Sequence, residues 1–290
     1  MKFNILILIL LSLVFNGCNN AQKTADKKQV LSVTIEPQKF FLEQLVGDKY
    51  TVNSLIPAGA NPETFDPVPS QLVSVSRSKA FFMIGSLGVE NTLVEKIKDN
   101  NPDVLFISCS DGIKLIEDDA HHNCDTASPH HGGDPHIWSS PSTAKVIIQN
   151  MYDSLIAFDK ENQDYYKEKY DKLVSIIDST DFVIKGHLEK VSHKDFIIYH
   201  PALTYYAQEY GLKQHVIEQD GKNPTPRQLA NLIDTAKDKH IKIVFMQQEY
   251  DMKNAETIAK AIDAKMVPIN LLNYNWSEEM IDIAKAFTYE

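Results

Sequence analysis

The fold is decided by one stretch, Lys160-Glu-Asn-Gln-Asp-Tyr-Tyr-Lys-Glu-Lys-Tyr-Asp-Lys-Leu-Val-Ser-Ile-Ile-Asp-Ser-Thr-Asp-Phe-Val-Ile-Lys-Gly186. Its aromatic and apolar residues recur at helical spacing, and no glycine or proline interrupts it before Gly186. At about 1.5 Å per residue, such a helix extends for roughly 40 Å. Because this length is enough to run from one lobe of a protein to another, we predict a linking helix over residues 159–188.

The sequence on both sides of this helix alternates between strand and helix patterns. Short apolar runs bounded by turn residues, such as Ala80–Ile84, are typical of buried parallel strands. We therefore predict an α/β fold with an N-terminal β/α lobe over residues 31–158 and a C-terminal β/α lobe over residues 189–290. The expected strands are residues 31–35, 50–56, 80–84, 104–107, 195–200, 241–246 and 266–269, and the expected helices are 38–47, 91–97, 142–158, 201–210, 228–239, 254–262 and 277–287.

The first residues have the features of an export signal. Lys2 precedes an apolar run that is too short to span a bilayer, which needs about 20 residues. Cys18 follows behind a glycine, so we predict a signal peptide over residues 1–17 and lipidation of Cys18. The alternative is an ordinary cleaved signal in which Cys18 is incidental. Residues 18–30 are polar and aperiodic, which predicts a flexible tether and an exported protein anchored to a bacterial membrane.

The charge balance is acidic, with 29 Lys and Arg against 39 Asp and Glu. Without residues 1–17, whose only charged side chain is that of Lys2, the formal net charge changes from −10 to −11. Such a surface argues against binding to nucleic acid or to a membrane through a polybasic patch, and it is compatible with attracting cations.

Half of the ten histidines fall within residues 121–136. Imidazole is the commonest protein ligand for zinc and its neighbours. The surrounding Gly, Pro, Asp and Ser predict a solvated loop over residues 117–134. Taken alone, this segment is either a polar surface loop or a metal-binding loop.

Two cysteines, Cys109 and Cys124, remain outside the export segment. In an oxidising compartment they are expected to pair. Closing a loop of about 15 residues stabilises a chain by on the order of 3 kcal/mol in the chain-entropy estimate. Two free thiols, or a soft metal site that uses Cys124, are the alternatives.

Three residues that can bind a metal lie at or near the predicted carboxyl ends of strands, where ligands gather in open α/β sheets. His200 ends a predicted strand, and Glu63 lies in a proline-rich loop after another. His136 follows Asp134 and Pro135 in a rigid turn. Considered singly, His200 is explained as a core histidine whose hydrogen bonds are satisfied, and Glu63 as a solvent-exposed loop residue. Their shared position makes them candidate ligands.

Several short motifs follow one another along the chain, each weak by itself. They are Gly47-Asp48, Leu55-Ile-Pro-Ala-Gly59, Pro62-Glu-Thr-Phe-Asp-Pro67, Gly85-Ser-Leu-Gly-Val-Glu90, Asp134-Pro-His-Ile-Trp-Ser-Ser-Pro141, Tyr199-His-Pro-Ala-Leu-Thr-Tyr-Tyr206 and Tyr210-Gly-Leu212. By their order and spacing, the chain from Leu31 to its C-terminus resembles the zinc- and manganese-specific solute-binding proteins of metal ABC transporters. It is most similar to the zinc-uptake binding proteins of that family.

The resemblance implies two β/α lobes joined by one long helix, with the metal held in the cleft by side chains from both lobes. His136 and His200 match ligand histidines of the family. Glu63 stands where most members have a histidine. A carboxylate oxygen is a competent zinc donor, but it makes the site harder and manganese more plausible. The alternative is that Glu63 does not bind the metal.

The resemblance leaves the fourth ligand open. Asn270 stands where manganese-selective members often carry an acidic residue. Since an amide is a poor ligand, we expect water, the histidine-rich loop or Glu249 to complete the shell. Asp66 or a backbone carbonyl is expected to orient the ligand imidazoles.

The histidine-rich loop also has a counterpart in the family. Zinc-transporting members carry a His- and acid-rich insertion before the Asp-Pro-His motif, and residues 117–131 occupy that place. This implies Zn2+ as the cargo, with Mn2+ less favoured. The expected auxiliary metal-binding residues are His121, His122, His130 and His131.

We therefore predict a monomeric extracytoplasmic receptor, without catalytic activity, that captures zinc and delivers it to an ABC permease. One alternative is a zinc hydrolase, because two His, one Glu and an open position form the ligand set of catalytic zinc. The sequence contains neither His-Glu-x-x-His nor Gly-x-Ser-x-Gly. The other alternative is a surface adhesin lipoprotein that binds metal incidentally.

Overall fold

Two four-stranded parallel sheets form the framework of the computed structural model, which describes residues 28–99, 101–117, 133–218, 221–250 and 252–288. The first sheet has the order β2-β1-β3-β4 and the second the order β6-β5-β7-β8. Each sheet belongs to one lobe, so the predicted α/β fold with two β/α lobes is confirmed. The strands are β1 (Val30–Val33), β2 (Thr51–Ser54), β3 (Ala80–Met83), β4 (Leu105–Ser108), β5 (Asp195–Ile198), β6 (Lys213–Val216), β7 (Ile243–Gln247) and β8 (Lys265–Ile269).

Several helices begin or end at residues whose backbone preferences suit a helix terminus. Four of them, α2, α3, α5 and α8, carry a proline in the first turn, where the missing N–H has no helical partner to lose. Gly211 follows α7 with φ 63°, a left-handed conformation that glycine adopts without steric cost. The helices other than the linking helix are α2 (Glu36–Val46), α3 (Pro69–Ser76), α4 (Gly88–Lys98), α5 (Pro141–Phe158), α7 (Thr204–Tyr210), α8 (Pro226–Asp238), α9 (Lys253–Ile262) and α10 (Trp276–Ala286).

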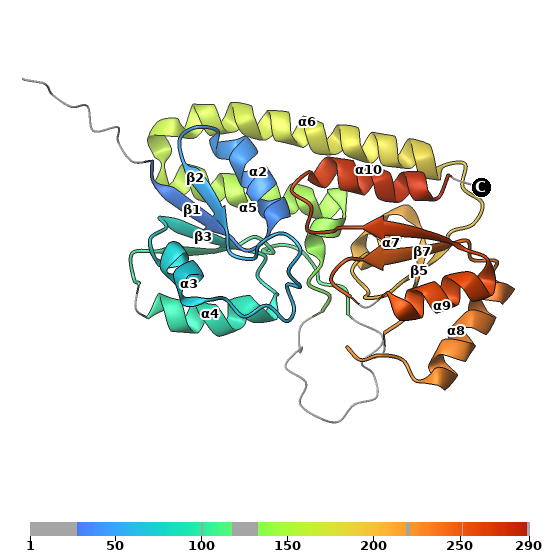
Figure 1. The fold of residues 1–290 in the computed structure, drawn as a ribbon. Helices are drawn as coiled ribbons and strands as arrows, with labels where there is room; N and C mark the ends of the chain where they lie inside the picture. Colours follow the sequence, from blue (N-terminus) through green and yellow to red (C-terminus); the bar gives the residue numbers. More distant parts are fainter. Residues whose placement is uncertain (1–27, 100, 118–132, 219–220, 251, 289–290) are drawn as a thin grey trace, which may run out of the picture.

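The linking helix α6 (Gln163–Leu188) runs along both lobes. It packs against α2 and α5 of the first lobe and against α10 of the second (Figure 1). Its buried face includes Tyr166, Leu173 and Ile184. A short 3-10 turn, Lys160–Asn162, precedes it. The prediction of one long helix between the lobes is confirmed.

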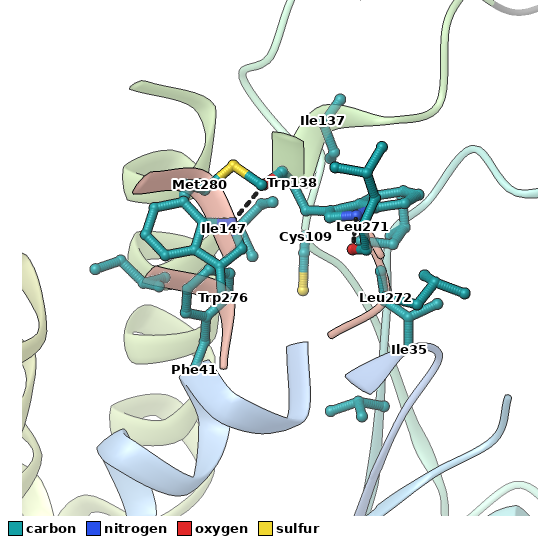
Figure 2. Close-up of a cluster of buried hydrophobic side chains, with 14 of the residues drawn as sticks. Ile35, Phe41, Cys109, Ile137, Trp138, Ile147, Leu271, Leu272, Trp276 and Met280 are labelled. Carbon is teal, nitrogen blue, oxygen red and sulfur yellow. Dashed lines mark hydrogen bonds between the residues drawn. The ribbon is translucent and has the colours of Figure 1, made fainter. Parts of the chain in front are cut away.

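A second connection between the lobes is a buried tryptophan pair. The indole Nε1 of Trp138 donates to the carbonyl of Leu271 at 2.8 Å, and Nε1 of Trp276 donates to the carbonyl of Trp138 at 2.7 Å. Phe41 of α2 packs edge-on against the Trp276 ring, with centroids 5.2 Å apart. Figure 2 shows these side chains together with Ile137. The Trp138–Trp276 pair therefore joins the lobes through packing and two buried hydrogen bonds.

Two elements, α3 and β6, were missed by the sequence prediction. Only Val75 of α3 is buried, so its sequence has no apolar stripe. β6 is an edge strand of four residues, Lys-Gln-His-Val, with exposed or half-buried side chains. Apolar periodicity is weak in both cases because each element places only one or two apolar side chains against the core.

Several predicted features lie outside the described residues. These are the signal peptide, Cys18, most of the tether, and the histidine-rich loop with His121, His122, His130, His131 and Cys124. Cys109 is fully buried, with 0% exposure, and because Cys124 lies outside the described residues, the pairing of the two stays a prediction. In the part of the chain that is described, no helix has the length and apolar character needed to cross a bilayer.

The Trp138–Trp276 pair predicts a specific loss of stability on substitution. Trp276→Phe keeps an aromatic ring against Phe41 but leaves the buried carbonyl of Trp138 without its donor. An unsatisfied buried carbonyl costs about 1–3 kcal/mol, so we expect the free energy of unfolding to fall by about that amount in urea titrations. Phe182→Ala is the control because Phe182 is 78% exposed and its loss should change stability by less than about 0.5 kcal/mol. Equal stabilities of Trp276→Phe and wild type would contradict this role.

Candidate metal site

Three candidate ligands from distant parts of the chain meet where the lobes face each other. Glu63 follows β2, His136 follows β4, and His200 follows β5. One ligand atom from each of these residues lies within 4.8 Å of the other two. In the described ranges, this is the only group of three or more His, Cys, Asp or Glu side chains with such spacing. The structure therefore brings together the three residues predicted as ligands.

A short turn presents Glu63 to the site. The side-chain oxygen of Asn61 accepts a hydrogen bond from the Glu63 N–H at 2.9 Å. Pro62 lies between them and limits the backbone further. The Glu63 side chain is 29% exposed, so its carboxylate stands at the solvent side of the group.

Asp134 holds His136 through two hydrogen bonds. Its Oδ1 accepts from both the backbone N–H and Nδ1 of His136, each at 2.8 Å. Burial raises the pKa of Asp134, but the charge and hydrogen bonds of His136 outweigh it, and the pKa is lowered overall. The hydroxyl of Tyr205 donates to the Asp134 carbonyl at 2.7 Å. The turn that carries His136 is therefore fixed on both sides.

Glu218 orients His200 in the same way. Its Oε1 lies 2.8 Å from Nδ1 of His200, and the His200 N–H donates to the side chain of Gln247 at 2.9 Å. Since an ionised carboxylate only accepts, Nδ1 of each ligand histidine carries the proton. Nε2 is then the nitrogen left for a metal, which is the usual carboxylate–histidine–metal arrangement.

The donor atom of His200 fits a metal ligand. Nε2 is buried and has no hydrogen-bond partner of good geometry in the described part of the chain, although Oε1 of Glu63 lies 3.1 Å away. A buried polar atom of this kind is costly unless something binds it. Two imidazole nitrogens and one carboxylate oxygen match the donors that zinc accepts.

The carboxylates also set the protonation of His200. Burial lowers its pKa, but the hydrogen bond to Glu218 and the charges of Glu218 and Glu63 outweigh it and raise the pKa to about 10. In the metal-free protein the ring is therefore protonated at neutral pH. A divalent cation has to displace that proton to bind.

The structure corrects one predicted role and clarifies two others. Asp66 is exposed, and the groups that orient the imidazoles are Asp134 and Glu218. The side chain of Asn270 accepts from the Leu272 N–H at 3.0 Å, which is a turn-forming role. Glu249 is close enough to His200 for their charges to interact, but it is not part of the group of three.

The sequence contained a signal for only one of the two orienting carboxylates. Asp134 lies within the Asp-Pro-His motif, two residues before its histidine, so a local turn was foreseeable. Glu218 follows the edge strand β6 and meets His200 only because β6 pairs with β5. Since the β6 sequence has no strand-like apolar pattern, its partner could not be inferred.

One known protein family matches most of this chain. The family model of the periplasmic component A of zinc-uptake complexes matches residues 31–284. The chain belongs to this family. The predicted resemblance to the zinc-uptake binding proteins is therefore confirmed.

Individual members of the family are similar over most of the chain. The high-affinity zinc uptake system protein ZnuA of Bacillus subtilis is 29% identical over 279 residues, covering 92% of this chain and 87% of that protein. The zinc-binding lipoprotein AdcA of Streptococcus pneumoniae strain R6 is 27% identical over 93% of this chain. The match covers only 55% of AdcA, so this chain spans about half of that relative's length.

Solved structures show the same fold. A crystal structure of ZnuA has a TM-score of 0.82 at 30% identity and covers 89% of this chain and 97% of that one. A manganese-bound periplasmic metal-binding protein from Candidatus Liberibacter asiaticus has a TM-score of 0.76 at 18% identity. At that identity, the second similarity shows the fold alone.

Removing the Glu218 carboxylate should weaken metal binding. Glu218→Ala frees the His200 ring to rotate and lowers the basicity of Nε2, and loss of such an orienting group typically costs tenfold to a hundredfold in metal affinity. Calorimetric titration with zinc measures this directly. Glu189→Ala, an exposed glutamate beyond α6, is the matched control and should bind zinc like wild type. Equal affinities for Glu218→Ala and wild type would show that Glu218 does not orient the ligand.

Zinc affinity should increase with pH over a wide range. Because the pKa of His200 is raised to about 10 in the metal-free protein, the bound proton competes with zinc at every pH below that value. We expect the dissociation constant to fall by up to about tenfold per unit between pH 5.5 and pH 8. Competition with a chelator of known pH dependence measures the slope. A constant affinity above pH 6.5, the ordinary pKa of histidine, would contradict the raised value.

Proposed function

We propose that this protein is the extracytoplasmic binding component of a metal ABC transporter, which captures Zn2+ and delivers it to a membrane permease. The main support is the convergence of Glu63, His136 and His200 between two lobes, in a chain that belongs to a zinc-uptake family. The carboxylates behind both imidazoles add to this support, because they prepare nitrogen donors for a cation. In this function the site binds and releases its cargo without a chemical step.

The donor set favours zinc and tolerates manganese. Two imidazoles suit zinc, while a carboxylate in place of a third imidazole makes the site harder. In our proposal His136 and His200 bind through Nε2 and Glu63 binds through a carboxylate oxygen. Water or Glu249 completes the shell. The histidine-rich loop supplies auxiliary histidines for the same cargo.

Export and anchoring follow the same proposal. The predicted signal peptide and the lipidation of Cys18 place the protein outside the cytoplasm, tethered to a bacterial membrane. AdcA, one of the relatives, is a lipoprotein by name, which supports this arrangement. We propose that the receptor acts as a monomer, because the candidate site takes its ligands from a single chain.

Membership of a zinc-uptake family favours transport over the two alternatives. A hydrolase would use the open metal position to activate water, and an adhesin would bind metal only weakly. Assays of ester and peptide hydrolysis with the zinc-loaded protein separate the first alternative from transport. Activity that is lost in Glu63→Ala would favour the hydrolase.

Calorimetry on ligand variants tests the proposal. His136→Ala, His200→Ala and Glu63→Ala each remove one donor, and we expect each to weaken zinc binding by at least tenfold because one of three protein ligands is lost. His193→Ala, a histidine exposed in the loop before β5, is the matched control and should bind zinc like wild type. Manganese titrations of the same proteins establish the preference between the metals.

Two results of these titrations would contradict the proposal. Unchanged zinc affinity in both His136→Ala and His200→Ala would show that these histidines do not bind the metal. Zinc binding by wild type no tighter than millimolar would remove the transport function and favour the adhesin.

A further inference from the structure

The helix α7 carries two side chains that reach across to the first lobe. It begins at Thr204, shortly after the ligand His200, and Tyr205 and Glu209 lie about one turn apart on it. The segment before the helix is tied to the ligand, since the Ala202 N–H donates to the His200 carbonyl at 2.7 Å. A contact made by Tyr205 or Glu209 therefore fixes its partner relative to His200.

The hydroxyl of Tyr205 holds the start of the segment that carries His136. It donates to the Asp134 carbonyl at 2.7 Å and accepts from the Ile116 N–H at 3.2 Å. The Asp134 N–H in turn donates to the Ile116 carbonyl at 2.8 Å. Three hydrogen bonds thus join the phenol and two backbone segments in a closed ring. Tyr205 is only 4% exposed, so this ring of bonds is largely shielded from water.

The carboxylate of Glu209 holds the other end of the same segment. Its Oε2 accepts from the Ser142 N–H at 3.2 Å, from the Ser142 hydroxyl at 2.9 Å and from the hydroxyl of Ser140. Both serines lie at the start of α5, where the helix dipole favours a negative charge. Glu209 therefore anchors the point at which the His136 segment enters α5.

These two contacts bracket a candidate metal ligand. His136 lies between Asp134 and Ser140, and Oδ1 of Asp134 accepts from both its N–H and its Nδ1 at 2.8 Å. The ring centroids of His136 and His200 are 5.0 Å apart. Zinc takes imidazole nitrogens at about 2.0–2.1 Å, so the two rings must keep a nearly fixed separation. Since α7 follows His200 and holds both ends of the His136 segment, it is placed to set that separation.

We propose that Tyr205 and Glu209 are positioning residues: from α7 they hold the two ends of the His136 segment and thereby set the spacing of the His136 and His200 imidazoles. This inference rests on the proposed function, since it concerns affinity for the same metal. The tryptophan pair and α6 join the lobes independently. Loss of either positioning residue therefore leaves the lobes connected and frees one ligand to shift, so zinc affinity falls while the fold persists.

The hydroxyl of Tyr205 can be tested without removing its ring. We expect Tyr205→Phe to bind zinc about threefold to tenfold more weakly than wild type in calorimetric titrations of the full chain, because one hydrogen bond is worth about that factor. Tyr206→Phe is the matched control. The Tyr206 hydroxyl donates to the carbonyl of Met280 at 3.1 Å, within the second lobe. Its loss removes the same kind of bond and should leave zinc affinity within twofold of wild type.

A purely structural role of Tyr205 makes a different prediction. Both tyrosine variants would then lose zinc affinity in proportion to their loss of stability. We expect similar decreases in the melting temperature of the two metal-free variants, and a loss of affinity only in Tyr205→Phe. An affinity of Tyr205→Phe within twofold of wild type, or an equal loss in Tyr206→Phe, would overturn the proposal.

The other end of the segment is tested by Glu209→Ala. Glu209 is half-buried, so its truncation leaves the core intact. We expect zinc affinity to fall about threefold to tenfold here as well, while the exposed control Glu189→Ala binds like wild type. Wild-type affinity in Glu209→Ala would overturn the two-ended arrangement.

A double-mutant cycle shows whether the effect passes through His136. In His136→Ala the positioned ligand is absent, so adding Tyr205→Phe should weaken the remaining zinc binding by less than twofold. Multiplication of the two separate effects would show that Tyr205 acts on the lobes as a whole, and would overturn the proposal. If wild type itself fails to bind zinc, the proposed function fails. If wild type binds zinc and Tyr205→Phe and Glu209→Ala behave like it, only the inference about α7 fails.

Discussion

The whole site depends on a constraint at the junction of the lobes, where two buried indoles donate to backbone carbonyls. Trp138 lies two residues after His136, and its carbonyl is bonded to Trp276 while its Nε1 is bonded to Leu271. A metal site built from two lobes needs its donors within a few ångströms. The tryptophan pair maintains that distance, because any rotation of the lobes would leave buried polar groups unsatisfied. The helix α6 is a further connection between the lobes, because it packs against α2 and α5 of the first lobe and α10 of the second.

Within that frame, carboxylates decide how the site treats cations. Glu218 and Asp134 each fix one imidazole by its Nδ1, and Glu63 faces Nε2 of His200. These groups hold a proton on His200 in the metal-free state, so proton and metal compete for one position. The same negative charge that attracts a divalent cation therefore makes its binding sensitive to pH.

Much of the fold was predictable because the core elements have strong apolar periodicity. Strands such as β3 and β7 are continuous apolar runs, and α6 has a buried stripe along its full length. The elements that were missed, α3 and β6, lie at the surface. Few of their side chains are buried there, so their sequences show no apolar pattern. Among the site residues, Glu63, His136 and His200 could be proposed because proline-rich turns place them after strands. Glu218 could not, because its role arises from the pairing of β6 with β5.

The sequence by itself determined the parts that depend on local pattern and composition: two β/α lobes, a long linking helix, the family, and the residue types offered to a metal. Apolar periodicity and turn-forming residues are features of a few neighbouring residues, so they can be recognised from one sequence without the structure. Only the tertiary structure decided which carboxylate orients which imidazole and how the tryptophan pair joins the lobes. Those relations join residues as far apart as Trp138 and Trp276 or His200 and Glu218. Hydrogen bonds and ring contacts between such residues depend on distances of a few ångströms, which no local pattern encodes.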